Sequence, residues 1–130
     1  MITGGCFCGR VQYEVDPEAA KPSVCHCAGC RRASAAPAVA WVTVPAAAFR
    51  VVQGVLSTVR GRESEQGTCD GCGGVRGFCA DCGTHITFVG DDRTHEVDIT
   101  TCSLEDPDRF APTEDVFTRA KVAWMKTLAP

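Results

Sequence analysis

The chain has 130 residues, a net charge of −3 from 13 basic and 16 acidic side chains, and a hydrophobic fraction of 45%. This length predicts one domain over residues 1–130, with an apolar core large enough to fold without covalent cross-links. The charge balance argues against the strongly basic surface of a nucleic-acid-binding protein, and no apolar run approaches the roughly 20 residues of a membrane span.

Cysteine is the most informative residue type, with ten copies in the chain. The N-terminal residues 1–6 have neither a charged start nor an apolar stretch, so no signal peptide is expected and the predicted location is the cytoplasm, where thiols stay reduced. The cysteines occur at C-x-C and C-x-x-C spacings, which suit one shared metal ion better than long-range disulfides.

The apolar pattern along the chain has a period of two more often than 3.6, which predicts short strands. Turn signals separate these strands at Gly54, at residues 61–67 and at residues 90–93. The strands are expected at residues 10–15, 38–44, 49–52, 56–60, 86–90 and 95–101.

Helical signals are few. Residues 45–49 suit a single turn, and Ser103 is a candidate N-cap for a short helix that Pro107 interrupts. The C-terminal stretch 116–128 fits either a helix or an extended segment, and its Trp124 is expected to pack against the core. The sequence therefore predicts one mostly β domain.

One set of four cysteines fits a closed metal site. Cys6 and Cys8 lie two residues apart, so in an extended segment both sulfurs point to the same side. Cys79 and Cys82 form a C-x-x-C turn, and Gly83 after them suits the positive φ on which such a turn often ends. Together the two pairs predict a structural Cys₄ zinc site that ties the N-terminus to the middle of the chain.

A second set is different, because Cys25, Cys27 and Cys30 combine both spacings within one loop. Three protein ligands with one open position are the pattern of a catalytic zinc. The alternative is a second structural site in which Cys69, Cys72 or Cys102 supplies the fourth ligand, and spacing alone does not choose between the two. His26 is expected to face away from the ion.

A competing arrangement pairs Cys69 and Cys72 with Cys79 and Cys82 as a zinc ribbon. Only residues 73–78 separate the two knuckles, whereas ribbons usually place roughly 15–20 residues there. The arrangement is a poor fit to the spacing, but it remains an alternative.

Five segments, in this order, resemble the glutathione-dependent formaldehyde-activating enzyme family, also described as S-(hydroxymethyl)glutathione synthase-like proteins. The resemblance covers nearly the whole chain and is more specific for the fold than for the reaction. The segments are "GGCFCGRVQYEV" (4–15), "CHCAGCRRASAAP" (25–37), "FCADCGTHITF" (78–88), "DITTCSLEDP" (98–107) and "KVAWMK" (121–126).

The resemblance implies a compact fold of small stacked antiparallel sheets organised around two zinc sites. It implies a zinc-dependent carbon–sulfur lyase that joins formaldehyde to the thiol of glutathione. Arg31 and Arg32 then offset the charge of a bound thiolate or hold the carboxylates of glutathione. The matching residues are Cys6, Cys8, Cys79 and Cys82 as structural zinc ligands and Cys25, Cys27 and Cys30 as catalytic zinc ligands.

Departures from the family pattern leave other functions open. The Cys69/Cys72 knuckle looks like an insertion that could close the open position or bind a third zinc ion, and Asp115 stands where the family often has a histidine. The alternatives are a zinc-binding module without enzymatic activity, in which both sites are closed, and a related enzyme that uses another thiol or electrophile. Fold alone does not decide among them.

The expected partners are a small-molecule thiol and a small aldehyde, with no nucleic acid and no membrane.

Overall fold

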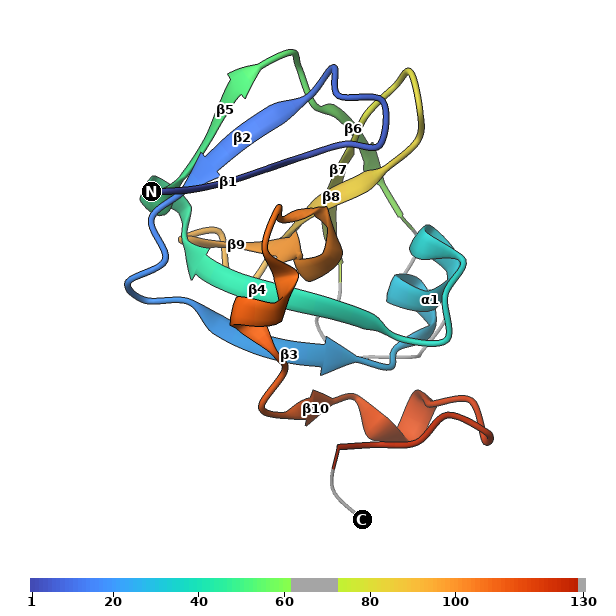
Figure 1. Cartoon of the computed structure of the whole chain (residues 1–130). Coiled ribbons are helices and arrows are strands. Elements are labelled where there is room, and N and C mark those ends of the chain that lie inside the picture. Colours follow the sequence, from blue (N-terminus) through green and yellow to red (C-terminus); the bar gives the residue numbers. More distant parts are fainter. Residues whose placement is uncertain (62–72, 129–130) are drawn as a thin grey trace.

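The structure is a computed structural model that describes residues 1–61 and 73–128. Within these residues strands dominate, and only one α-helix is present (Figure 1). The strands are β1 (Ile2–Gly5), β2 (Gln12–Val15), β3 (Lys21–Cys25), β4 (Val39–Pro45), β5 (Phe49–Gln53), β6 (Ser57–Arg60), β7 (Gly74–Phe78), β8 (His85–Gly90), β9 (Glu96–Thr100) and β10 (Asp115–Val116). The helix is α1 (Ala28–Ser34), and the 3₁₀ helices are η1 (Ala46–Ala48), η2 (Thr101–Ser103), η3 (Pro107–Phe110) and η4 (Thr118–Ala120).

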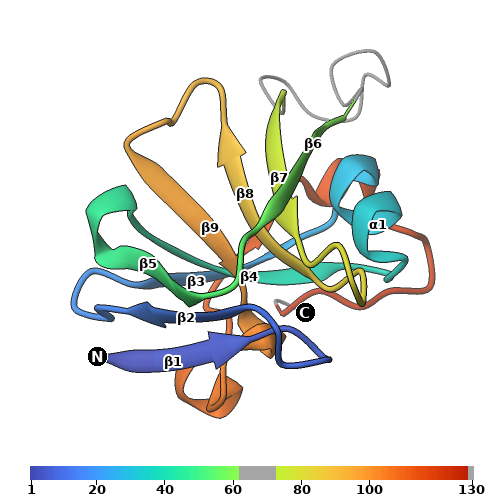
Figure 2. The same cartoon turned by 90° about the horizontal axis from the view of Figure 1, so that it is seen from above.

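The strands form two sheets. The smaller sheet has the order β1-β2-β5, and the larger sheet has the order β10-β3-β4-β9-β8-β7-β6. All neighbouring strands are antiparallel except β10 and β3, which run parallel. Seen from two directions, the smaller sheet lies against one face of the larger one (Figures 1 and 2). The predicted mostly β fold of stacked sheets is therefore confirmed.

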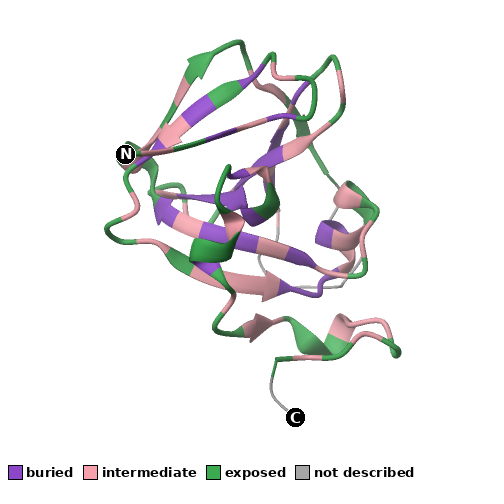
Figure 3. Ribbon diagram, viewed as in Figure 1, coloured by how far each residue is buried: buried purple, intermediate pink, exposed green. Residues whose placement is uncertain are grey.

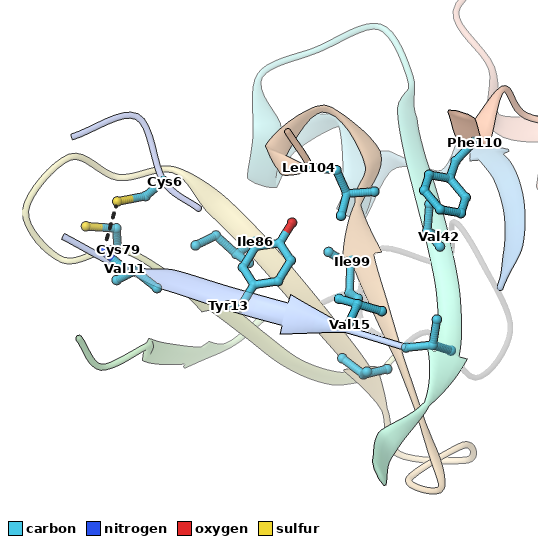
Figure 4. Packing of buried hydrophobic residues seen from close by; sticks show 12 residues of the cluster. Cys6, Val11, Tyr13, Val15, Val42, Cys79, Ile86, Ile99, Leu104 and Phe110 are labelled. Atoms are coloured by element: carbon cyan, nitrogen blue, oxygen red, sulfur yellow. Dashed lines mark hydrogen bonds between the residues drawn. The ribbon is translucent and has the colours of Figure 1, made fainter. Parts of the chain in front are cut away.

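The main hydrophobic core fills the space between the two sheets. Tyr13 of β2 lies at its centre, fully buried, with Ile86 and Ile99 of the larger sheet beside it (Figure 4). The phenol oxygen of Tyr13 lies 2.7 Å from the hydroxyl oxygen of Ser103, so its one polar atom has a partner. Burying these apolar side chains contributes most of the energy that holds the sheets together, about 25 cal/mol for each Å² removed from water.

The opposite face of the larger sheet carries a second, smaller cluster. It contains Trp41 of β4, Phe88 of β8 and the three cysteines at positions 25, 27 and 30. A register shift between Gly77 and Phe78 lies opposite Ile86. The shift breaks the alternation of β8, so Ile86 belongs to the main core and Phe88 to the second cluster.

The predicted strands correspond to β2, β4, β5, β6, β8 and β9. The sequence did not predict β1, β3, β7 or β10. Their sequences explain this, because β1 and β7 each contain two glycines, β3 contains Pro22, and β10 has only two residues. Such segments lack the β-branched alternation that marks a strand, and pairing with neighbours fixes their conformation. The single turn expected at residues 45–49 is η1.

Two local predictions were wrong. Trp124 is 74% exposed and does not pack against the core; residues 117–128 are exposed or half-buried, and the helical turn that they contain is η4 (Figure 3). Ser103 does not cap a helix that runs into Pro107. It ends η2, and its hydroxyl donates to the carbonyl oxygen of Thr100 at 2.8 Å, while η3 begins separately after Asp106.

Candidate functional site

Cys25, Cys27 and Cys30 meet where β3 ends and α1 begins. Cys25 is the last residue of β3, Cys27 is the N-cap of α1, and Cys30 lies in its first turn. The Cys27 sulfur accepts a hydrogen bond from the backbone N–H of Cys30 at 3.4 Å and lies 3.4 Å from the Cys25 sulfur. All three residues are at most 5% exposed, and their sulfurs lie within 4.8 Å of one another. The segment predicted as one loop is thus a strand end followed by a helix.

The three thiols compete for their protons. Hydrogen bonds from Cys25 and Cys30 lower the pKa of Cys27 to about 2. The pKa of Cys25 is raised above its ordinary range by the hydrogen bonds of that residue with Cys27 and Cys30. For Cys30, the hydrogen bond with Cys25 favours the thiolate. The hydrogen bond with Cys27, together with burial, outweighs this effect and raises the pKa of Cys30 to about 11. The protein alone therefore holds one thiolate here, and three thiolates require a cation among them. This donor set fits a metal ion.

Cys6, Cys8, Cys79 and Cys82 form a second cluster, within 4.8 Å of one another. The first two come from the loop between β1 and β2, and the others from the loop between β7 and β8. The Cys8 sulfur lies 3.6 Å from that of Cys6 and 3.8 Å from that of Cys79. The structure thus brings the predicted pairs together and joins a loop of the smaller sheet to a loop of the larger one.

Both loops of the four-cysteine cluster contain a glycine with a positive φ. Gly9 and Gly83, each after the second cysteine of its pair, have φ values of +82° and +81°. The positive φ expected for Gly83 is confirmed. A side-chain hydrogen bond with Thr84, 3.2 Å from the sulfur, lowers the pKa of Cys82 to about 5. Backbone geometry and neutral donors therefore prepare this cluster to hold a cation.

A buried arginine lies next to the three-cysteine cluster. Both terminal nitrogens of Arg76, on β7, lie 4.0 Å from the sulfur of Cys30. Its guanidinium lies 4.5 Å from the centre of the Phe88 ring, and the residue is only 4% exposed. An arginine buried this deeply beside thiols places a permanent positive charge where thiolates form.

The three cysteines open onto a pocket of about 540 Å³ on the outer face of the larger sheet. Strand register explains its floor, because directly opposed residues of neighbouring strands point to the same side of a sheet. Five opposed residues cross the floor in the order Lys21, Thr43, Asp98, Phe88 and Arg76. Trp41 and Phe88 give the end near the cysteines an apolar surface.

The far end of the pocket is charged. Asp98 accepts hydrogen bonds from the Thr43 hydroxyl at 2.6 Å and from Arg93 at 2.9 Å. Arg93 also reaches Glu96 at 3.1 Å. Since Asp98 is 7% exposed, its paired charge stays fixed in the pocket floor. The pocket therefore offers an apolar end beside the sulfurs and a polar end away from them.

Arg31 and Arg32 lie away from this pocket. Arg31 donates to the carbonyl oxygens of His26 and Ala120, both at 3.3 Å. Arg32 is exposed, and both arginines border a shallow hollow beside Trp124. Neither is among the residues that line the pocket at the cysteines. Their predicted contact with substrate remains a prediction.

His26 and Asp115 join the cysteine segment to the C-terminal segment. His26 is fully buried, and its Nε2 lies 2.7 Å from a carboxylate oxygen of Asp115. The other carboxylate oxygen accepts the backbone N–H of Leu128 at 2.8 Å. Val116 and Phe117, which follow Asp115, line the pocket. His26 therefore links the cysteine segment to Asp115, and its ring nitrogens are not among the clustered ligand atoms.

No fourth Cys, His, Asp or Glu joins the three sulfurs among residues 1–61 and 73–128. Cys102 is exposed and borders a different hollow. Cys69 and Cys72, the other candidates for a fourth ligand and for a third metal ion, lie outside the described residues. No disulfide joins the eight described cysteines.

Sequence reasoning missed Arg76, Asp98 and the aromatic wall. One signal was present: "GVRGF" and "EVDIT" each place a charged residue, Arg76 or Asp98, at the central position of the strand beside apolar residues. A charge buried in this way needs a partner or a function. What the sequence did not reveal is that the strand register sets these residues in one row.

The fold and the site define a small, mostly β protein with two clusters of cysteines that could hold metal ions, one of which opens onto a pocket. Residues 1–120 match the family model described as glutathione-dependent formaldehyde-activating enzyme. The chain belongs to this family, as its resemblance predicted.

A crystal structure of a Rhodobacter sphaeroides protein is similar in fold, with a TM-score of 0.62 and 23% sequence identity. The match covers 88% of this chain and 99% of that one. No curated protein matches this chain. In the described residues, no helix has the length and apolar character needed to cross a membrane.

Proposed function

We propose that the protein is a zinc-dependent carbon–sulfur lyase that joins a thiol to a small aldehyde at Cys25, Cys27 and Cys30. Membership of the family supports glutathione and formaldehyde as the substrates. The observation that carries the proposal is a buried set of three thiols, without a fourth ligand in the described part of the chain, that opens onto a pocket. Free thiols throughout that part suit a reducing compartment such as the cytoplasm.

Zinc is the metal we propose for both clusters, because sulfur-only donor sets of three or four cysteines favour it. We propose a structural role for Cys6, Cys8, Cys79 and Cys82 and a catalytic role for the other cluster. Bound zinc would lower the pKa of a substrate thiol, so that the thiol reacts as a thiolate at neutral pH.

The chain's own residues bind and orient the substrates. Trp41 and Phe88 exclude water beside the sulfurs, and the charged far end of the pocket fits the polar part of a peptide thiol. The new bond forms between the thiol sulfur and the carbonyl carbon of the aldehyde. The thiol proton ends on the carbonyl oxygen, so no oxidant or further reactant is needed.

Exchange NMR tests this reaction, because the condensation also proceeds without a catalyst. The measurement is the rate at which glutathione and formaldehyde interconvert with S-(hydroxymethyl)glutathione at equilibrium. The zinc-loaded protein should raise this rate by at least tenfold, and Cys27→Ala should lose the increase. Cys102→Ala is the matched control, since Cys102 lies outside the pocket.

Two results would contradict the proposal. If the protein does not accelerate the exchange, this reaction is not its activity; acceleration with another thiol in place of glutathione would then identify a related enzyme. If Cys27→Ala is as active as the unaltered protein, the catalytic site lies elsewhere. Replacing Arg31 and Arg32 by alanine tests their predicted role, because loss of a carboxylate contact would weaken glutathione binding.

A further inference from the structure

Arg76 is a buried cation in contact with the three-cysteine cluster. It comes from β7, far along the chain from the cysteines, and reaches Cys30 across the floor of the pocket. Both terminal nitrogens lie at the same distance, 4.0 Å, from one sulfur. The planar guanidinium thus presents an edge to the cluster, which a single ammonium group would not do.

Two features hold this arginine in place. Its guanidinium lies over the ring of Phe88, and Phe88 is its directly opposed neighbour on β8. Because the residue is 4% exposed, water screens its charge little, and its interaction with nearby anions is stronger than at the surface. A long cationic side chain held in this way acts as a fixed part of the site.

The charge of the cluster explains why a cation is needed there. Three thiolates around a divalent ion leave one unit of negative charge, and a fourth thiolate would leave two. Burial of such a charge is costly unless a partner compensates for it. The four-cysteine cluster is supported by neutral donors: the N–H of Val11 donates to Cys6, and Thr84 lies beside Cys82. The arginine of its loops, Arg10, is 73% exposed and pairs with Asp81. A buried arginine in contact with a sulfur therefore distinguishes the three-cysteine cluster.

We propose that Arg76 is the positioning residue that compensates the negative charge of the Cys25/Cys27/Cys30 centre and makes its fourth position selective for an anionic sulfur ligand. This inference rests on the proposed function, since it requires that a thiolate binds at that position. It adds a selectivity to that function: a thiol that ionises on binding is preferred over a thioether of the same size and shape.

Glutathione and S-methylglutathione separate these effects, because they share every carboxylate and amide but only glutathione has an ionisable thiol. We would measure the affinity of the zinc-loaded protein for both by calorimetry across a pH series. In Arg76→Gln, glutathione affinity should fall by about tenfold or more, the usual effect of losing one charged partner. S-methylglutathione affinity should be unchanged. A role of Arg76 in binding carboxylates would instead weaken both ligands.

The pH series gives a second readout that a merely structural role would not change. Glutathione affinity rises with pH above the pKa of the bound thiol, and Arg76→Gln should move this rise upward by about one pH unit. Arg76→Lys keeps the charge without the two-nitrogen contact and should lie between the two proteins. Arg60→Gln is the matched control, because it removes one arginine from β6, where Arg60 pairs with the exposed Asp91.

The outcomes distinguish two failures. If the unaltered protein binds glutathione no more tightly than S-methylglutathione, the proposed function is wrong and the role of Arg76 falls with it. If it prefers glutathione and Arg76→Gln keeps that preference, only the inference about Arg76 is overturned. Should Arg76→Gln fail to load two zinc ions, Arg76→Lys decides: an unchanged preference contradicts the inference, and a reduced one supports it.

Discussion

At the scale of single residues, protons decide how the three-cysteine cluster binds a metal. At neutral pH Cys27, with its pKa lowered to about 2, is a thiolate, whereas Cys25 and Cys30 keep their protons. A metal ion bound by all three sulfurs must therefore displace two protons. Metal affinity at this cluster depends on pH more steeply than a single titrating cysteine would allow.

The metal affinity of the three-cysteine cluster should decrease with decreasing pH. As pH falls, protons compete with the metal at Cys25 and Cys30, so the apparent affinity should fall by roughly a hundredfold for each pH unit between about pH 6 and 9. Competition with a chelator measures this affinity. The metal ion to follow is the one bound by the unaltered protein and not by Cys27→Ala. A slope of one proton or none would contradict the assignment of protons in the cluster.

At the scale of elements, the C-terminal segment is fastened to the segment that carries the cysteines. β10 pairs with the end of β3, Asp115 contacts His26 and Leu128, and Arg31 reaches the carbonyl oxygen of Ala120. The hydrogen bond with His26 lowers the pKa of Asp115. Its carboxylate is therefore charged at neutral pH, and the contacts of Asp115 with His26 and Leu128 weaken only as pH falls through the lowered value.

Arg31→Ala should loosen this attachment. Loss of its two hydrogen bonds to backbone carbonyls, worth about 1 kcal/mol each, should speed amide exchange in residues 117–128 by tenfold or more. Hydrogen exchange followed by mass spectrometry measures it. Arg32→Ala is the matched control, because the neighbouring arginine is exposed. Equal exchange in both variants would mean that Arg31 does not hold the segment.

Elements also show what the sequence could predict. The C-x-C and C-x-x-C spacings predicted which cysteines group together, since ligand spacing is a local property. They did not predict that Cys27 would cap a helix, because that short helix has no alternating or helical apolar pattern. Arg76 was out of reach, because its approach to Cys30 depends on the pairing of β7 with β8 and on the register of the whole sheet.

At the scale of the whole molecule, the four-cysteine cluster connects the two sheets. Cys6 and Cys8 belong to the smaller sheet's edge, while Cys79 and Cys82 follow β7 of the larger one. Cys79 is fully buried in the main core. Metal bound there would add its binding energy to folding, and structural zinc sites contribute about 10 kcal/mol or more.

This predicts unequal effects of two similar variants. Cys79→Ala should prevent stable folding, because the lost metal energy is comparable to a typical net stability of about 5–15 kcal/mol. Cys27→Ala should fold and lose only one metal ion, since the four-cysteine cluster is intact. Soluble yield and thermal unfolding compare them. A Cys79→Ala variant that melts within a few degrees of the unaltered protein would refute a structural role.

The overall architecture was predictable from the sequence only in part. The alternating segment "RVQYEV" predicted a half-buried strand, because burial of one face imposes a period of two, and the β-branched and aromatic segment "AVAWVTV" predicted a more buried one. The exposed Trp124 shows the limit, since an aromatic residue in a short tail has no neighbouring pattern to place it. The family resemblance supplied the stacking of the sheets, which no local pattern contains.

The most direct test of the account is native mass spectrometry of the purified protein, with zinc counted before and after glutathione is added. We predict two zinc ions and a glutathione adduct that Cys27→Ala does not form and Cys102→Ala retains. Absence of an adduct at millimolar glutathione, with the metal in place, would mean that the fourth position is closed and would contradict the enzymatic function proposed for Cys25, Cys27 and Cys30.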